Sequence, residues 1–139
     1  MENFTTFWCF RLAALTRKVS RAYNSLCARH GVTASQSFVL FDLLDHEGSS
    51  VKDIAARIQL DSPAVTGLID RLHKEGLLQR AEDPNDRRSL QIFLTPKGRA
   101  LAEAMLPMGR EFHLAMKQSL SPDLAERFEQ ALAALESAY

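Results

Sequence analysis

The sequence has no surplus of charge of either sign, because 17 lysines and arginines balance 17 aspartates and glutamates. Bulk attraction to nucleic acid or to an anionic membrane is therefore not predicted, and such binding must depend on where the charges lie. No apolar run reaches the length of a membrane span, since Arg11, Arg17 and Lys18 interrupt the apolar opening. The opening also lacks the pattern of a signal peptide, so we expect a cytoplasmic protein.

Cysteine is scarce, and so are the motifs of enzyme chemistry. The two cysteines, Cys9 and Cys27, fall in one predicted helix. The helical rise places them ~27 Å apart, too far for a disulfide within one chain. The sequence has no Cys-x-x-Cys, no glycine-rich phosphate loop, no Gly-x-Ser-x-Gly and no His-Glu-x-x-His. We therefore predict a protein that is not an enzyme and that has no metal site or cofactor.

Apolar residues are present at helical spacing over most of the chain. The first such stretch predicts one amphipathic helix from Phe4 to about Arg29. The second begins at Thr33, whose distance to Gln36 is that of a capping box, and reaches about His46. Two further stripes near the end of the sequence predict helices over residues 101–120 and 124–139.

Three of the helix starts share a hydroxyl residue followed by proline. The hydroxyl can accept a hydrogen bond from an unpaired backbone amide, and proline is tolerated at the first helical position. These pairs are Ser62-Pro63, Thr95-Pro96 and Ser121-Pro122. A short helix over residues 52–58 precedes the first pair, and Gly76 ends the helix that follows it.

Residues 77–81 and 89–94 are too short for helices and flank a segment rich in turn-forming residues, so they predict a β-hairpin. Leu90, Ile92 and Leu94 alternate along the second strand and are expected to anchor it in the core. The predicted fold class is mainly α with a small β-hairpin wing, in the order of a winged helix-turn-helix. The long helices outside this unit carry wide apolar stripes, which predicts an intertwined homodimer.

The helix that follows the first Ser-Pro pair is a candidate for contact with DNA. Small residues near a helix start let the backbone approach the major groove, and hydroxyl groups can bond bases or phosphates. An ordinary surface helix would fit the same residues equally well. The outward face is predicted to carry Ser62, Pro63, Ala64, Thr66, Gly67, Asp70 and Arg71.

The tip of the predicted hairpin is charged. Asp86 and Arg88 lie two residues apart on one side of an extended chain, so the carboxylate is expected to orient the guanidinium. An arginine at this place suits a narrow minor groove, whose potential is strongly negative. Arg87 is expected to meet phosphate or water. A charged loop alone is usually solvated surface, but its place directly after a helix-turn-helix favours DNA contact.

The segment LDSPAVTGLIDRLHKEGLLQRAEDPNDRRSLQIFLTPKG resembles the recognition helix and wing of the MarR family of bacterial transcriptional regulators. GVTASQSFVL is also similar to the family's entry to its second helix, and the order of helices matches over nearly the whole chain. The most specific match is Asp-x-Arg at Asp86 and Arg88, followed by Leu94, Thr95 and Gly98.

This resemblance implies a single MarR-like domain over residues 1–139. Residues 1–32 and 100–139 would form the dimerisation helices, and residues 33–99 the winged helix-turn-helix that binds DNA. It also implies a homodimeric regulator, here expected to be a repressor, that binds a pseudo-palindromic double-stranded operator. A small-molecule ligand would release it.

The opening WCFRLAALTRKVSRAYNSL is similar to the organic-hydroperoxide-sensing branch of the family. Cys9 matches the cysteine that is oxidised there, and Tyr23 matches a tyrosine of that branch. Ala34 and Ser37 stand where the branch has two further tyrosines, which would hydrogen-bond and activate the thiolate. A small buried hydrophobic side chain is the simpler role for Cys9.

The resemblance leaves other sensors open. A small aromatic or phenolic effector, as in many family members, would lie between the long helices and the winged region, lined by Trp8, Phe10, Phe38 and Phe41. Three hypotheses therefore remain: a ligand-released repressor, a thiol-based peroxide sensor that uses Cys9, and a winged-helix protein-interaction module that does not bind DNA.

Overall fold

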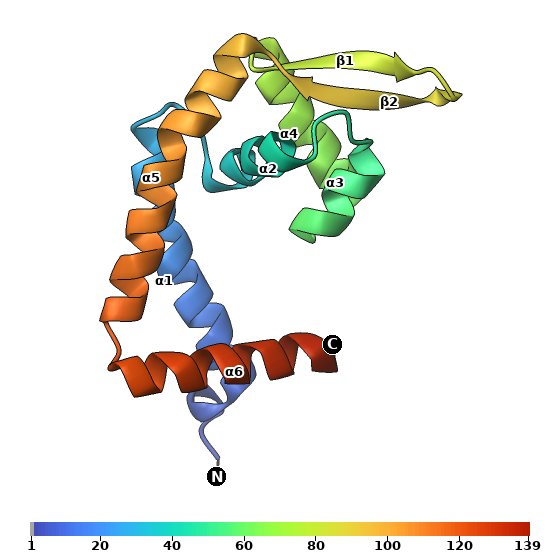
Figure 1. The fold of residues 1–139 in the computed structure, drawn as a ribbon. Helices are drawn as coiled ribbons and strands as arrows, with labels where there is room; N and C mark the ends of the chain where they lie inside the picture. The colour runs from blue at the N-terminus through green and yellow to red at the C-terminus, as the bar shows by residue number, and fades with distance from the viewer. Residues whose placement is uncertain (1) are drawn as a thin grey trace. The chain divides into compact units, whose positions relative to one another are not determined.

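The computed structural model describes residues 2–139, which form six α-helices, one short 3-10 helix and a two-stranded antiparallel sheet (Figure 1). The prediction of a mainly α fold with a small hairpin is confirmed. In chain order the elements are η1 (Phe4–Thr6), α1 (Trp8–Ala28), α2 (Ala34–Asp45), α3 (Val51–Ile58), α4 (Ser62–Lys74), β1 (Leu78–Asp83), β2 (Asp86–Leu94), α5 (Pro96–Gln118) and α6 (Pro122–Ala138).

The chain divides into two compact units, one up to Met105 and one over Leu106–Tyr139. The boundary falls within α5, two residues before Pro107. Proline inside a helix removes one backbone hydrogen bond and crowds the preceding turn. No helix of the described residues is long and apolar enough to cross a membrane.

The first predicted helix is interrupted near its start, so the expectation of one continuous helix from Phe4 was wrong. Asn3 caps a short 3-10 turn by accepting from the backbone amide of Thr5 at 3.1 Å. Phe7 is then extended, with φ −70° and ψ 139°, and α1 begins at Trp8. Threonine is a weak helix former, because its branched side chain loses freedom and its hydroxyl bonds nearby backbone, which favours the break.

The predicted capping box at the start of α2 is confirmed. The Thr33 hydroxyl accepts from the Gln36 amide at 3.1 Å, and the Gln36 side chain accepts from the Thr33 amide at 2.9 Å. Ser121 caps α6 as expected, and the Thr95 hydroxyl accepts from the amide of Gly98 at 3.0 Å. These bonds satisfy amides that have no partner within their helices.

The cap of α4 is one residue earlier than the sequence pattern predicted. The Asp61 carboxylate accepts from the Ala64 amide at 2.8 Å, so Ser62 and Pro63 are the first two helical residues. Asp61 is as good a capping residue as serine, and proline is tolerated in the first turn because that amide has no helical partner. The Ser62 side chain is therefore not the cap.

The core of the first unit lies between α2, α3, α4 and the inner end of the hairpin. Its fully buried side chains include Leu40 and Leu43 of α2, Ile54 of α3, and Ile69 and Leu72 of α4. The apolar spacing that predicted these helices therefore also identified the faces that pack together.

The hairpin extends further into the charged segment than predicted. Leu78 pairs with Leu94 and Arg80 pairs with Ile92, and the register shifts between Glu82 and Asp83. In Figure 1 the two strands project beyond α3 and α4.

Only the inner part of the second strand is anchored in the core. Ile92 and Leu94 are buried as expected, but Leu90 is 42% exposed, so its predicted role as an anchor was wrong. Leu90 pairs with Glu82 near the tip, where no helix covers the sheet.

Candidate nucleic-acid interface

The start of α4 presents a small, open surface. Val65, Leu68, Ile69 and Leu72 are buried and hold the helix against the core. The predicted outward face is exposed at Ser62, Pro63, Ala64, Thr66, Asp70 and Arg71, and half-buried at Gly67.

Two local features define how this face can meet a partner. No atom lies within 4 Å of the position that a Cβ on Gly67 would take, so the backbone there is open to close approach. The Thr66 hydroxyl donates to the Ser62 carbonyl at 2.9 Å, which leaves its oxygen free to accept from a donor outside the helix. Both features suit contact with the edges of base pairs in a major groove.

An ion pair that sequence patterns did not indicate links this helix to the wing. Asp70 of α4 pairs with Arg80 of β1. The two residues are ten positions apart and belong to different elements, so only the fold brings them together. The pair helps to hold the hairpin beside α4.

The tip of the wing is a tight turn shaped by aspartates. Asp83 accepts from the amide of Asn85 at 2.9 Å, and Asp86 accepts from the backbone amide of Arg88 at 3.0 Å. Short carboxylates commonly fold back on nearby backbone in this way.

The predicted orientation of the Arg88 guanidinium by Asp86 is not what the structure shows. No ion pair among residues 2–139 joins the two side chains, because the Asp86 carboxylate faces the backbone of its own turn. Arg87 and Arg88 are both exposed at the tip. The aspartate therefore fixes the backbone from which Arg88 projects, and leaves its guanidinium available to a partner.

The inner end of the wing is held by the loop after α2. One Glu47 carboxylate oxygen accepts from the Leu94 amide at 3.1 Å, and the other pairs with Arg99 of α5 at 2.6 Å. A single side chain thus connects this loop to the end of β2 and to the beginning of α5.

The residues predicted to sense a signal form two separate groups, one where Tyr23 of α1 meets α2 and the other at the beginning of α1. The hydroxyl groups of Tyr23 and Ser37 are 3.0 Å apart, and the Tyr23 ring stacks on Phe38 with centroids 5.8 Å apart. Burial raises the pKa of Tyr23, against the opposing effect of its hydrogen bond with Ser37. Phe41 is half-buried on α2. Ser37 stands where the sequence similarity places a tyrosine of the hydroperoxide-sensing branch. In this structure it lies within hydrogen-bond distance of Tyr23.

The other group lies at the beginning of α1. Trp8 is 71% exposed, Phe10 is 37% exposed, and Cys9 between them is also exposed. Phe10 packs edge-on against Phe4, with ring centroids 5.1 Å apart. The simpler role predicted for Cys9 was that of a small buried hydrophobic side chain, but Cys9 is exposed in a single chain. Cys27, in contrast, is fully buried.

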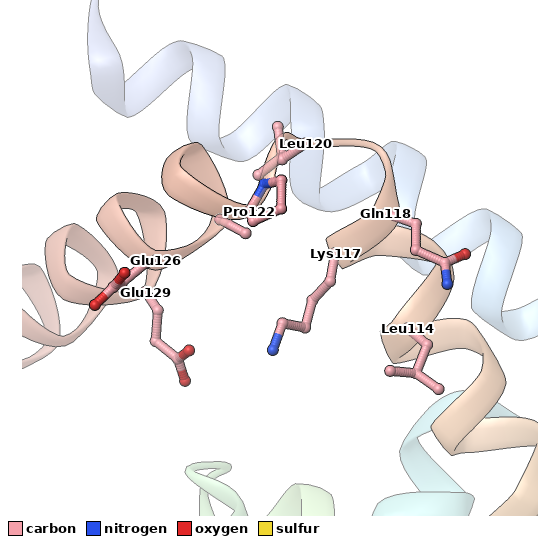
Figure 2. A pocket seen from close by; sticks show the side chains of 8 residues that line it. Leu114, Lys117, Gln118, Leu120, Pro122, Glu126 and Glu129 are labelled. Carbon is pink, nitrogen blue, oxygen red and sulfur yellow. The ribbon is translucent and has the colours of Figure 1, made fainter.

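The second unit has an open cavity of about 580 Å³ beside the loop that connects α5 to α6 (Figure 2). In Figure 2 the Lys117 side chain extends into the open space between the two helices. None of the predicted sensing residues lines this cavity; its lining is Leu114, Lys117, Gln118, Leu120, Pro122, Ala125, Glu126 and Glu129. Among the described residues no group of three or more histidines, cysteines or carboxylates is arranged to hold a metal ion.

The arrangement of the helices and the hairpin agrees with the comparisons to known proteins. The sequence model of the MarR family matches residues 32–90, which include α2, α3, α4 and most of the hairpin. The chain belongs to the MarR family.

Its curated relatives are named as transcriptional regulators. The chain is 45% identical over 97 residues to the HTH-type transcriptional regulator TtmR of Methylorubrum extorquens, covering 70% of this chain and 50% of that protein. It is 34% identical over 95 residues to the organic hydroperoxide resistance transcriptional regulator of Bacillus subtilis, covering 68% of this chain and 65% of that protein. The matches thus span about half to two thirds of these relatives.

A solved structure confirms the fold over almost the whole chain. The BpsR protein of Bordetella bronchiseptica, described in terms of the regulation of its DNA binding by 6-hydroxynicotinic acid, superposes with a TM-score of 0.90 at 27% identity. The superposition covers 98% of this chain and 97% of that one.

Proposed function

We propose that the protein is a cytoplasmic MarR-type repressor that binds a pseudo-palindromic DNA operator as a homodimer and leaves it when a small-molecule ligand binds. The observation that carries this proposal is the open face of α4, from Ser62 to Gly67, beside a wing tip with two exposed arginines. Family membership and relatives named as transcriptional regulators support the same conclusion.

Each surface has a separate role in this proposal. The face of α4 enters the major groove, where Ser62 and Thr66 reach base edges and Arg71 reaches a phosphate. Arg88 enters the adjacent minor groove, and Arg87 contacts the phosphate backbone. Asp86 supports the turn from which Arg88 projects.

The homodimer would use residues 1–32 and 100–139, with residues 33–99 left to bind DNA. Large apolar side chains on these helices are exposed in one chain, among them Trp8 at 71%, Leu15 at 51% and Phe128 at 47%. Burial of these groups against a second copy would remove them from water. A two-fold dimer then presents two α4 helices to half-sites about one helical turn, ~34 Å, apart.

The proposed effector is a small aromatic or phenolic molecule. Rings suited to such a ligand are present at Tyr23, Phe38 and Phe41 and, at the other end of α1, at Trp8 and Phe10. The regulation of BpsR by 6-hydroxynicotinic acid gives a precedent for this class of ligand in a similar fold.

A second mechanism of release is oxidation of Cys9, which is favoured by its exposure and by the similarity to the Bacillus subtilis regulator. An organic hydroperoxide would oxidise the thiolate to a sulfenic acid and would itself be reduced to an alcohol. If Cys9 is the sensor, Cys9→Ser keeps its operator affinity after hydroperoxide treatment, whereas Cys27→Ser loses it as the wild type does. If hydroperoxide-treated Cys9→Ser lost operator binding in a mobility-shift assay, Cys9 would be excluded as the sensor.

The function itself is tested by binding to the DNA upstream of the protein's own gene. We expect one preferred site in a mobility-shift screen, with an affinity that falls steeply as salt rises, because phosphate contacts release counterions. A protein-interaction module would show no such preference. Absence of any preferred site at low salt would contradict the proposed function.

A further inference from the structure

The wing is extended at its inner end by a segment from outside the hairpin. The Gly48 amide donates to the Ile92 carbonyl at 2.8 Å, and the Ile92 amide donates to the Ser49 carbonyl at 2.9 Å. Residues 48–49 therefore pair with β2 on its other edge, as a short antiparallel bridge. The place at which β2 leaves the core depends on where this loop is held.

A guanidinium from α3 holds that loop. Arg57 Nη2 donates to the Ser49 hydroxyl oxygen at 2.6 Å, and the Ser49 hydroxyl donates to the His46 carbonyl at 2.5 Å. The same guanidinium donates to both carboxylate oxygens of Asp42 in α2, from Nε at 2.8 Å and from Nη2 at 2.9 Å. One side chain thus joins α2, α3 and the loop that borders the wing.

Burial of the Asp42 carboxylate makes its pairing with Arg57 important for stability. Its side chain is only 8% exposed, and a carboxylate removed from water is costly unless it is paired and hydrogen-bonded. His46 Nδ1 lies 3.6 Å from the same carboxylate, but the two-pronged contact comes from Arg57. A planar guanidinium matches two carboxylate oxygens at once, which the single ammonium of lysine cannot do.

We propose that Arg57 is a positioning residue for DNA binding: through Asp42 and Ser49 it fixes the loop that carries the wing relative to the recognition helix. The inference rests on the proposed function and concerns a residue that itself need not contact DNA. Arg57 lies in α3, and α3 packs against both α4 and β2. A shift of the loop would therefore move the wing tip relative to the face of α4 and misplace Arg88 in its groove.

The test compares Arg57→Lys, which keeps the charge and loses the fork, with Arg29→Lys, an exposed arginine at the end of α1. We expect Arg57→Lys to bind the operator about tenfold more weakly and Arg29→Lys to bind as the wild type does. In the Arg57→Lys background, Arg88→Ala should cost less affinity than in the wild type, because a displaced wing no longer delivers Arg88. A loss of stability alone would leave the cost of Arg88→Ala unchanged.

A second measurement does not depend on DNA. The backbone amide of Ile92, which donates to the Ser49 carbonyl, should exchange its hydrogen faster in Arg57→Lys than in the wild type. Ser49→Ala, which removes the two hydrogen bonds of the Ser49 hydroxyl and keeps the pair of Arg57 with Asp42, should show a smaller increase and serves if Arg57→Lys fails to fold. The proposal would be overturned if the Ile92 amide exchanged at the wild-type rate in both variants. It would also be overturned if Arg88→Ala cost as much operator affinity in the Arg57→Lys background as in the wild type. Absence of a preferred site for the wild type would instead count against the proposed function.

Discussion

At the residue scale, the two arginines of the wing tip have different expected roles. The turn that holds Arg88 is fixed by Asp86, and its side chain forms no ion pair among the described residues. Arg88→Ala should therefore weaken operator binding by about 1–3 kcal/mol, which is about 5- to 150-fold in affinity, without lowering the melting temperature. Mobility-shift titration and thermal denaturation check both parts.

Arg87→Ala provides the matched control for this change. Because Arg87 is expected to meet phosphate, its loss should weaken binding to all sequences alike and reduce the salt dependence. If the Arg88→Ala variant bound the operator with wild-type affinity, the proposed minor-groove contact of the wing would be contradicted.

Sequence patterns identified exposed residues better than they identified partners. Helical periodicity placed Ser62 and Thr66 outward because the buried face of α4 determines the opposite one. The pairs of Arg57 with Asp42 and of Arg80 with Asp70 join different elements, so no local spacing could reveal them. Asp86 was placed correctly at the tip, but its preference for nearby backbone over a guanidinium depends on the detailed turn.

At the scale of elements, the start of α5 is fitted closely against the turn between α4 and β1. A Cβ on Gly98 would overlap the backbone carbonyl of Leu77, which also accepts from the Thr95 amide at 3.1 Å. Gly98→Ala should therefore destabilise the protein by about 1–3 kcal/mol, the usual range for an overpacked site. Chemical denaturation followed by circular dichroism measures the change.

Gly67 offers a control of the same chemistry in an open place. A Cβ there meets no atom within 4 Å, so Gly67→Ala should stabilise α4 by about 0.5–1 kcal/mol. Equal stability of Gly98→Ala and the wild type would show that the contact between α5 and Leu77 is looser than described.

Element types followed from sequence, whereas their ends depended on competing local contacts. The capping box of α2 could be predicted from the sequence because its two partners, Thr33 and Gln36, lie within four residues of each other. The start of α4 was displaced by Asp61, a second good cap next to the predicted one. The strands ran further towards the tip because their pairing continues beyond the part that is buried, which an apolar pattern does not record.

At the scale of the whole molecule, the balanced charge and the exposed apolar helices have one explanation. With 17 basic and 17 acidic residues, a single chain has little general attraction for DNA. Dimerisation would bury apolar side chains such as Trp8 and Phe128 and would bring two recognition helices to one operator. Specific binding would then come from paired contacts.

The most direct test of this account is a footprint of the wild-type protein on its own upstream DNA, with the stoichiometry measured on the same fragment. The account predicts one dimer on two symmetric protected half-sites about one helical turn, ~34 Å, apart, with flanking minor-groove protection from the wings. Protection of no discrete site, or of a single half-site by one chain, would contradict it.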